Sequence, residues 1–446
     1  MPNNPEGYLF GLLAVEATSV AAIIWVVWHR RSGQLMGYHP PYRRLGYSFS
    51  HVLVVLVAVD AMERRLSGPS FLTRVPVVGR VAATLMPRLP FLLFIVALWL
   101  LFCVAFLPRN GQMGLANEYS QLWILWIAWA VVSSLLTLSN STTRQWNDYL
   151  LSVAVLLASL LTMRRLSAKV RLKVVRFMLQ ISSVLSLASL VIDRNWAMTT
   201  VWTGGFLRSE RLQGIFPQPN TAGAMFAVLL VITLLDRSRN KIFATFEFCI
   251  ACIPLYMTGS RGAAGALILA LLAALAFRHY PRVFKVAFVV LAAGAVLAPI
   301  VLGARSAWLN GRATTWTIAL DLWSNNRLIG GGAWPAAEGG KPVAFYAHNQ
   351  LLQSLAETGI VGALLIFGAL RYSARRLFVC GNELAAALLT MVIFQLYFEN
   401  SFRIFTPQFV FPTVVLIAVM GADLPPAGVR SKISRAADQT AVLMSQ

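Results

Sequence analysis

Apolar runs of about 20 residues recur along this chain of 446 residues and constrain its fold more than any other feature. An α-helix of that length crosses the ~30 Å hydrocarbon core of a bilayer, and backbone groups in lipid must be satisfied within the segment. The composition agrees, since only 12% of the residues are charged, against roughly 25% in soluble proteins. The sequence predicts an all-α, polytopic integral membrane protein.

About 12 to 13 transmembrane helices are expected from the apolar runs, within one integral membrane domain over residues 1–446. The N-terminus lacks the basic segment of a cleavable signal peptide, so the first run is kept as a helix. The predicted spans are Tyr8 to Trp28, Gly46 to Met62, Leu89 to Leu107, Leu122 to Leu138, Asn147 to Met163, Val174 to Ile192, Thr221 to Leu235, Ile242 to Thr258, Ala263 to Phe277, Val283 to Val301, Leu351 to Leu370, Leu384 to Phe398 and Phe409 to Met420.

The formal charge of +21 does not indicate a nucleic-acid partner, because most cationic residues lie in short connections between apolar runs. There they contact anionic lipid and fix orientation, since basic loops stay cytoplasmic. The strongly basic segments are Arg164 to Lys173, Asp236 to Lys241, Arg278 to Lys285 and Arg371 to Arg376. The opposite, external face then receives Asp193 to Phe216, Thr258 to Ala263, Leu302 to Ala347 and Glu399 to Gln408.

The first third of the chain leaves two topologies open. His29 to Arg44 and Glu63 to Arg88 are both basic, and the order of the later helices puts the second of them outside. Either Phe71 to Met86 lies as an amphipathic element on the membrane surface, or Gly46 to Met62 does not cross.

Each external connection carries an arginine among small, polar or aromatic residues: Arg211, Arg261, Arg312 and Arg403. External arginines oppose the usual charge bias, and a guanidinium matches phosphate oxygens while staying charged when partly buried. Arg261 precedes a helix, whose N-terminus favours anions, and Asn220 or Thr221 is the expected N-cap of the helix after Arg211. Several such arginines at one cavity would bind a diphosphate, although each alone also suits a lipid headgroup.

The segment from Arg327 to Leu365 begins as a glycine-rich polar loop and ends as an apolar helix, with His348 and Asn349, a candidate substrate-binding residue, at the junction. Histidine exchanges a proton near neutral pH, so His348 is a candidate general base, although a helix-start role is the simpler interpretation. Gly330, Gly331 and Gly332 are interpreted as flexible loop residues. The pair Cys249 and Cys252 is interpreted as buried small residues, and the external histidine has no companions at metal-ligand spacing, so no metal or cofactor is expected.

Five motifs, in this order, resemble the bacterial O-antigen ligase and Wzy-type polysaccharide polymerase family. They are RLQGIFPQPN at 211–220, GSRG at 259–262, GR with a following tryptophan at 311–316, LIGGG at 328–332 and AHNQLLQSLAETGIVG at 347–362. The likeness covers roughly residues 193–370, which we take as the catalytic region, with an external loop over 302–348.

The resemblance implies about twelve helices of the polyprenyl-phosphate glycosyltransferase class, with both termini inside. It implies transfer of a glycan from a polyprenyl diphosphate carrier, such as undecaprenyl diphosphate, to an acceptor glycan or glycolipid outside the bacterial inner membrane, facing the periplasm. The reaction would be metal-independent and inverting. Arg211 and Arg261 would bind the diphosphate, with Arg312 a weaker match, and His348 would be the general base. Thirteen spans with an external N-terminus depart from this pattern.

The residues leave the finer function open. A ligase and a polymerase share the donor and differ in the acceptor, and either would serve lipopolysaccharide or exopolysaccharide synthesis in the cell envelope. The alternative is a transporter or flippase with Glu16, His51, Asp60 and Glu247 along an intramembrane path. Nearby aromatics such as Trp316 would either stack on sugars or anchor the chain at the membrane interface.

Overall fold

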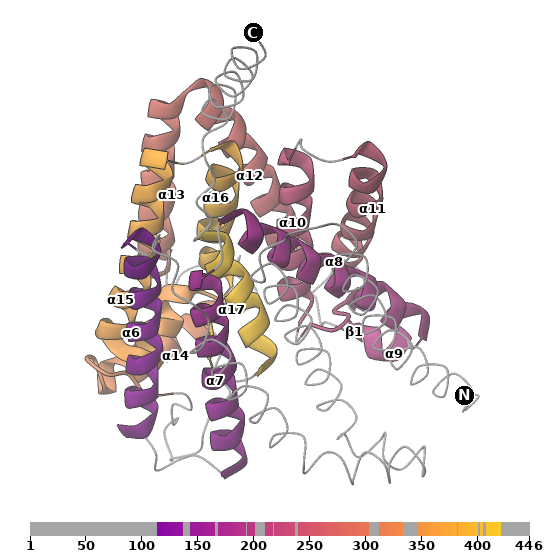
Figure 1. Cartoon of the computed structure of the whole chain (residues 1–446). Helices are drawn as coiled ribbons and strands as arrows, with labels where there is room; N and C mark the ends of the chain where they lie inside the picture. The colour runs from indigo at the N-terminus through magenta and orange to yellow at the C-terminus, as the bar shows by residue number, and fades with distance from the viewer. Residues whose placement is uncertain are drawn as a thin grey trace, which may run out of the picture.

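Each predicted span from Leu122 onward coincides with an observed helix of the computed structural model (Figure 1). The long helices are α6 (Gly114–Leu136), α7 (Thr143–Arg165), α8 (Ala168–Ile192), α10 (Pro219–Leu235), α11 (Lys241–Thr258), α12 (Arg261–His279), α13 (Pro281–Leu302), α15 (Gln350–Cys380), α16 (Glu383–Phe398) and α17 (Pro407–Met420). Shorter elements are α9 (Arg194–Ala197), α14 (Arg312–Asn325), and the strands β1 (Met198–Thr200) and β2 (Glu210–Leu212).

The structure describes residues 114–136, 143–165, 168–192, 194–200, 210–216, 218–236, 240–302, 312–332, 347–380, 382–399, 402–404 and 407–420. The predicted spans Tyr8 to Trp28, Gly46 to Met62 and Leu89 to Leu107, and with them the two topologies of the first third, lie outside these ranges. Within them, four stretches are long and apolar enough to cross a membrane: Val170–Val191, Lys241–Thr258, Arg261–His279 and Gln350–Phe378. Shorter apolar helices accompany them, so the fold is that of an all-α polytopic membrane protein.

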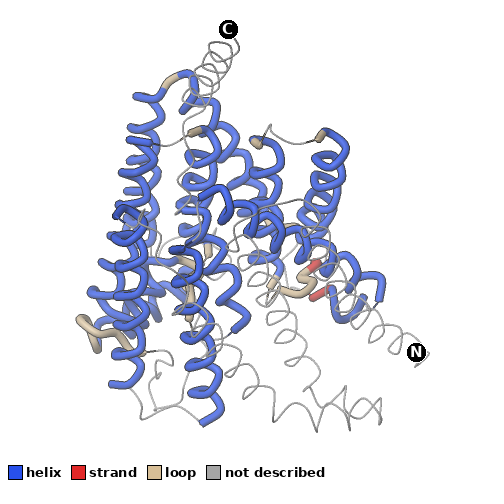
Figure 2. The backbone as a smooth tube through the Cα atoms, viewed as in Figure 1, coloured by secondary structure: helices blue, strands red, loops and turns tan. Residues whose placement is uncertain are grey.

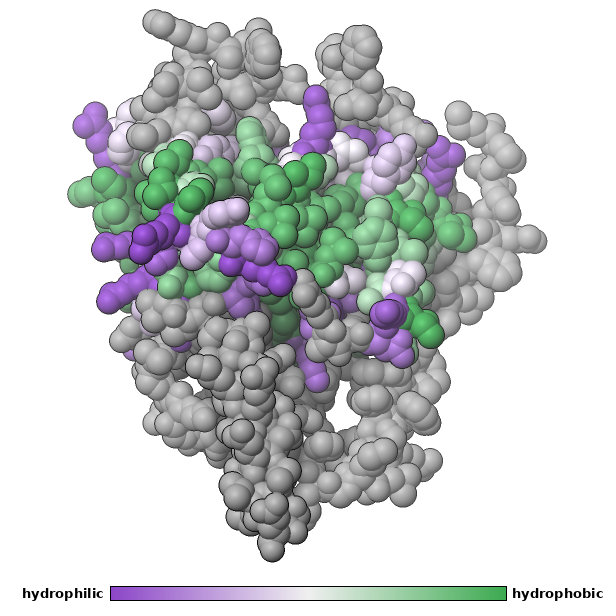
Figure 3. Space-filling view, turned by 90° about the horizontal axis from the view of Figure 1, so that it is seen from above, coloured by the Kyte–Doolittle hydropathy of each residue, from purple (hydrophilic) through white to green (hydrophobic). Residues whose placement is uncertain are grey.

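Basic connections gather at one end of the bundle. The end of α10 and the start of α11, the turn joining α12 to α13, and the end of α15 and the start of α16 lie at the upper end in Figure 2, while the turn joining α11 to α12 and the start of α10 lie at the other. Asp236 and Lys241 therefore lie at the same end as the segment 278–285, in agreement with the charge pattern. Viewed from above, hydrophobic residues cover much of the visible helical surface, with hydrophilic patches among them (Figure 3).

Helix α10 is the centre of the core. It is apolar all round and is buried from Ala222 to Thr233, as expected of a helix enclosed by others. It packs against α8, α11, α12 and α16. At Gly223 the approach is close enough that a Cβ atom would lie 2.8 Å from the Cβ of Ser260. This glycine therefore allows the start of α10 to meet the turn between α11 and α12.

Small residues hold α12 against α16. The buried face of α12 consists of alanines, and a Cβ atom added at Gly265 would lie 3.3 Å from the ring of Phe394. Small side chains let helix backbones approach where lipid offers no hydrophobic driving force. The outward faces of α11, α12 and α13 instead carry exposed large apolar side chains, among them Phe246, Ile268 and Val290. A surface of that kind suits contact with acyl chains.

Helix α15 is broken at Gly359, whose φ of 65° lies in the left-handed region. The break frees carbonyl groups, which in lipid need new partners. The backbone amides of Gly331 and Gly332 donate to the carbonyls of Ala356 and Glu357 at 2.7 and 2.9 Å. From α6, the Trp129 indole nitrogen donates to the carbonyl of Thr358 at 2.8 Å.

The prediction that Gly330 to Gly332 are flexible loop residues is wrong. Gly330 and Gly332 have φ angles of 72° and 73°, and a Cβ atom at Gly330 would lie 2.5 Å from the backbone of Glu357. At Gly359 a Cβ atom would lie 2.2 Å from the carbonyl oxygen of Leu328. Side chains are excluded because two backbones touch here, so these glycines fix the loop against the broken helix.

Candidate active site

The turn Gly259–Ser260–Arg261 joins α11 to α12 as the sequence predicted. Gly259 ends α11 in a left-handed conformation, with a φ of 57°. The Ser260 hydroxyl then accepts a hydrogen bond from the amide of Ala263 at 3.3 Å and caps α12. Arg261 is therefore the first residue of the helix, where the unpaired amides favour an anion, and it is exposed.

Arg211 lies across this turn. Strand β2 pairs antiparallel with β1, which sets Arg211 opposite Thr199. The Nε atom of Arg211 donates to the carbonyl of Thr258 at 2.6 Å, and a Cβ atom added at Gly259 would lie 3.5 Å from that nitrogen. Burial lowers the pKa of the Arg211 guanidinium, Glu399 acts in the opposite direction, and Arg261 lowers it further. Arg211 remains charged, and it interacts electrostatically with both Glu399 and Arg261.

A chain of side-chain contacts runs from Arg211 towards the histidine. A terminal nitrogen of Arg211 donates to Asn220 Oδ1 at 2.7 Å, and Asn220 Nδ2 donates to Glu399 Oε1 at 2.7 Å. The other carboxylate oxygen, Glu399 Oε2, lies 3.7 Å from His348 Nδ1. Groups from β2, α10, the end of α16 and the start of α15 thus meet.

The expectation that Asn220 or Thr221 caps α10 is wrong. The helix begins at Pro219 with Gln218 as N-cap, and no side chain satisfies that cap. Proline at the first helical position needs no amide partner, so the helix can start at Pro219, two or three residues earlier than predicted. Asn220 is thereby released to bridge Arg211 and Glu399.

His348 adopts a left-handed backbone conformation, with a φ of 49°, and is the one non-glycine residue in the described ranges with a positive φ. That conformation is uncommon outside glycine and persists only where the surroundings hold it. The imidazole is 29% exposed and the Glu399 carboxylate 14% exposed. His348 thus has one side towards a carboxylate and an open side that a substrate can reach.

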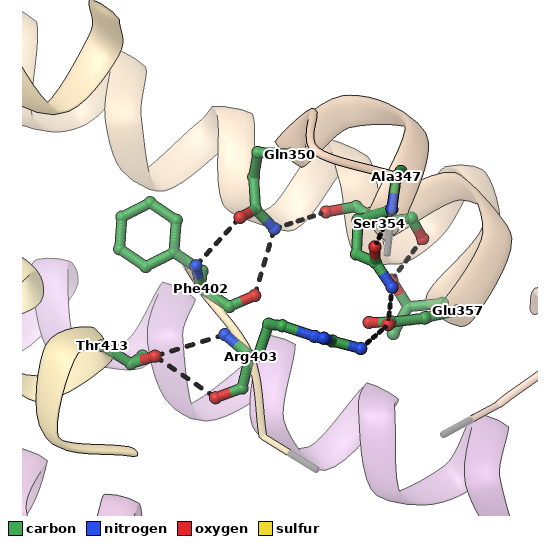
Figure 4. Close-up of polar contacts among 9 residues, drawn as sticks. Ala347, Gln350, Ser354, Glu357, Phe402, Arg403 and Thr413 are labelled. Atoms are coloured by element: carbon green, nitrogen blue, oxygen red, sulfur yellow. Dashed lines mark hydrogen bonds and ion pairs between the residues drawn. The ribbon is translucent and has the colours of Figure 1, made fainter. Parts of the chain in front are cut away.

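Arg403 and Asn349 are buried, and each contacts a distant part of the chain. Figure 4 shows the side chain of Arg403 directed towards Glu357. A terminal nitrogen of Arg403 lies 3.1 Å from Glu357 Oε1. Asn349 accepts a hydrogen bond from the amide of Leu352 at 3.1 Å, which caps α15, and donates to the carbonyl of Tyr397 at 3.3 Å. Binding of substrate by these two side chains remains a prediction.

Helix α14 begins at Arg312, whose side chain lies outside the described part of the structure. Trp316 of this helix is 2% exposed, and its indole nitrogen donates to the carbonyl of Ala347 at 2.8 Å. Neither a sugar-stacking nor an interface-anchoring role fits a ring so buried. Trp316 instead docks α14 against the residue before His348, which extends the support of the histidine to the external loop.

Two residues of this site were not among the predicted ligands. The sequence suggested Glu399 as a helix-end carboxylate that could orient a partner or pair with an arginine, and Asn220 as a possible cap. Each lies far along the chain from its partner, 179 residues separating Asn220 from Glu399. The only sequence signal for Glu399 is its place on the same predicted face as His348.

The helical bundle and this cluster define an all-α polytopic membrane protein with a polar site at one end. Residues 224–367 match the family model described as O-Antigen ligase, which confirms the resemblance and indicates a glycosyltransferase-type membrane enzyme. The matched segment is about a third of the chain and contains Arg261, Arg312, His348 and Asn349. Arg211, Glu399 and Arg403 flank it. The search of curated proteins gave no match.

Proposed function

We propose that this protein is a membrane glycosyltransferase of the O-antigen ligase or polysaccharide polymerase type. It moves a glycan from a polyprenyl-diphosphate carrier to an acceptor glycan or glycolipid on the external face of the bacterial cytoplasmic membrane. The observation that carries this proposal is the contact chain from Arg211 through Asn220 and Glu399 to His348, with Arg261 beside its first member. In this proposal the contact chain connects the cations that bind the diphosphate, Arg211 and Arg261, with the base His348.

The arginines serve the leaving group. During transfer the bond between the anomeric carbon and the diphosphate oxygen breaks, and negative charge develops on the departing carrier diphosphate. Arg211 and Arg261 stabilise that charge as fixed cations, assisted by the free amides at the start of α12. Their positions do not change during the reaction, so little reorganisation is required. Arg312 is a further donor-binding residue in this proposal, and the catalytic region extends over 193–370.

His348 serves the acceptor. An acceptor hydroxyl oxygen attacks the anomeric carbon from the side opposite the diphosphate, which inverts the configuration, and its proton passes to the imidazole. Glu399 orients the ring and stabilises the imidazolium that forms, since its carboxylate lies 3.7 Å from Nδ1. General base catalysis of this kind contributes on the order of 10² to 10⁴-fold.

A transporter would need charged groups along a path, and Glu247 was the candidate within the described residues. Its carboxylate is fully buried, 3.0 Å from Arg176 and 2.7 Å from the amide nitrogen of Gln180. The other candidates, Glu16, His51 and Asp60, lie outside the described ranges. A carboxylate held between two neighbours suits a structural pair better than a transport path.

The decisive experiment uses purified protein, a synthetic polyprenyl-diphosphate glycan and two acceptors, with a chelator present. The acceptors are a lipid A core glycolipid, which a ligase would use, and a second lipid-linked repeat, which a polymerase would use. We expect product with one of them, and a fall of at least about 100-fold in His348→Ala. His279→Ala removes an exposed histidine at the basic end and should retain full activity. Normal turnover by His348→Ala would refute the proposal.

A further inference from the structure

His348 and Glu399 are carried by two stretches of chain that meet at this site. His348 lies in the segment 347–357, at the start of α15, and Glu399 directly follows α16, with the described residues 402–404 lying before α17. The two stretches are far apart along the chain, so no short covalent connection fixes the distance between them. The separation between the imidazole and the carboxylate therefore depends on contacts that join the two stretches.

Gln350 and Asn349 provide direct contacts. The side-chain oxygen of Gln350 accepts from the amide of Phe402 at 2.9 Å, and its nitrogen donates to the carbonyl of the same residue at 3.1 Å (Figure 4). Asn349 donates to the carbonyl of Tyr397. The backbone is thus held on both sides of Glu399, by the two residues that follow His348.

Glu357 lies at the centre of a second, charged contact. Its carboxylate pairs with Arg403 at 3.1 Å and accepts a hydrogen bond from Gln353. The side-chain oxygen of Gln353 in turn accepts from the amide of Ala347 at 2.8 Å. The side chains of Glu357 and Arg403 are 8% and 6% exposed. An unpaired buried charge is costly, so loss of either side chain is expected to displace the other from its present position.

We propose that the Glu357–Arg403 pair, coupled through Gln353 to Ala347, is a positioning frame that sets His348 against Glu399. These residues act through His348 and do not touch substrate, so Arg403 has a different role from that predicted for it. The inference rests on the proposed function, because it assigns a role relative to the proposed base. Its physical basis is that a catalytic group must be held to within about 0.5 Å, and that His348 occupies a backbone conformation which requires support.

The test is a double-mutant cycle on the purified full-length protein. Glu357→Gln and Arg403→Gln are made singly and together, and kcat and the donor KM are measured per folded molecule. We expect each single variant to lower kcat about 10-fold with the donor KM changed less than about 2-fold. The double variant should be no worse than the poorer single variant, because both changes break one interaction. Arg403→Lys, which keeps the charge, should recover part of kcat.

Gln353→Met provides a gentler variant in case the charge changes prevent folding. It leaves Glu357 and Arg403 paired and removes the two hydrogen bonds of Gln353, to Glu357 and to Ala347, and we expect kcat to fall about 5-fold. The matched control is the cycle of Glu247→Gln and Arg176→Gln, a second buried pair. This control should lower stability without lowering kcat per folded molecule.

Two outcomes would overturn the frame while the proposed function stands. In the first, all variants of the frame lose stability yet keep kcat, as the control does, while His348→Ala is inactive. In the second, Arg403→Gln raises the donor KM with kcat unchanged, which would make Arg403 a donor-binding residue. An active His348→Ala would instead refute the proposed function, so the two failures are distinguishable.

Discussion

Two polar networks lie at opposite ends of helix α10, and they differ in how completely their charges are matched. At the C-terminal end, Arg176 lies 2.7 Å from Asp236 and 3.0 Å from Glu247. Gln180 donates to the same Glu247 at 2.7 Å. The guanidinium of Arg176 is enclosed by two carboxylates, and the side chains of Arg176 and Glu247 are 9% and 1% exposed.

At the N-terminal end of α10 the balance is reversed. Arg211 is influenced by the charges of Arg261 and of Glu399, and the Glu399 carboxylate also faces His348. Arg261 is exposed, Arg211 is partly buried and the imidazole is 29% exposed. This network, the open one, has two arginines and an exposed side, whereas the first, the closed one, has two carboxylates around Arg176, of which Glu247 is buried and Asp236 is 23% exposed.

The difference indicates which network is structural and which binds a ligand. In the closed network, Arg176 of α8 is paired with Asp236 at the end of α10 and with Glu247 of α11. This pairing stabilises the fold because an unpaired charge is costly in an apolar environment. An open group of cations is completed by an anion from outside, and a diphosphate supplies that charge. Changes in the closed network should therefore alter stability, and changes in the open one should alter turnover.

Arg211→Ala should produce the largest effect. It removes a partly buried guanidinium that holds both Thr258 and Asn220 in place, and truncation of one member of a buried charge contact costs about 2 to 5 kcal/mol. We expect kcat/KM to fall about 10³-fold, which corresponds to about 4 kcal/mol. The steady-state rate of glycan transfer from the lipid-linked donor gives this value. Arg278→Ala, at the basic end, is the control, and a loss in both variants alike would point to the membrane charge balance.

Glu247→Ala should have the next largest effect, on stability alone. It leaves Arg176 with only Asp236, and breaking a buried pair costs about 3 kcal/mol. Unfolding in detergent should show this decrease in free energy, while the transfer rate per folded molecule remains that of the native protein. A loss of turnover in fully folded Glu247→Ala would contradict the division between the two networks and would favour the transport alternative.

Glu399→Gln should lower kcat about 10-fold, since the carboxylate would no longer stabilise the imidazolium that forms during the reaction, and a partly exposed charge contact of this kind contributes on the order of 1 kcal/mol. Glutamine retains an oxygen that can accept from Asn220, so the shape of the site is preserved and the charge beside the imidazole is lost. The donor KM should change less than kcat. Asp321→Asn, an exposed carboxylate of α14, serves as a comparison. An unchanged kcat would mean that Glu399 does not orient His348.

The same division explains what could be predicted from the sequence. The ten long helices of the described residues were predictable because the length of an apolar run sets the length of a membrane helix, whereas the short helices α9 and α14 lie in stretches that were predicted as connections. Arg261 was predicted to precede the helix from Ala263 because it lies between Gly259 and Gly262 at the end of an apolar run, and in the structure it is the first residue of that helix. These features depend on neighbours within a few residues.

The rest of the site depends on contacts between distant parts of the chain. The pairing of Asn220 with Glu399, and of Glu357 with Arg403, leaves no local pattern, since glutamates and asparagines at helix ends are common. The break at Gly359 was missed because its partner loop begins some thirty residues earlier, at Arg327. In the sequence, a glycine that allows two backbone segments to approach closely cannot be distinguished from a glycine in a flexible loop, because the second segment is distant along the chain.

Glu210→Gln should have the smallest effect, although it lies next to Arg211. Glu210 pairs with Arg194 at 2.7 Å, but the two side chains are 48% and 71% exposed. An exposed ion pair contributes about 0.2 to 1 kcal/mol at most, because water already solvates both charges. We expect unfolding to change by less than about 0.5 kcal/mol and turnover by less than about 2-fold. A larger loss of turnover would mean that the open network extends along β2 to Glu210, and that charge excess at this end, rather than the contacts of Arg211 itself, determines donor binding.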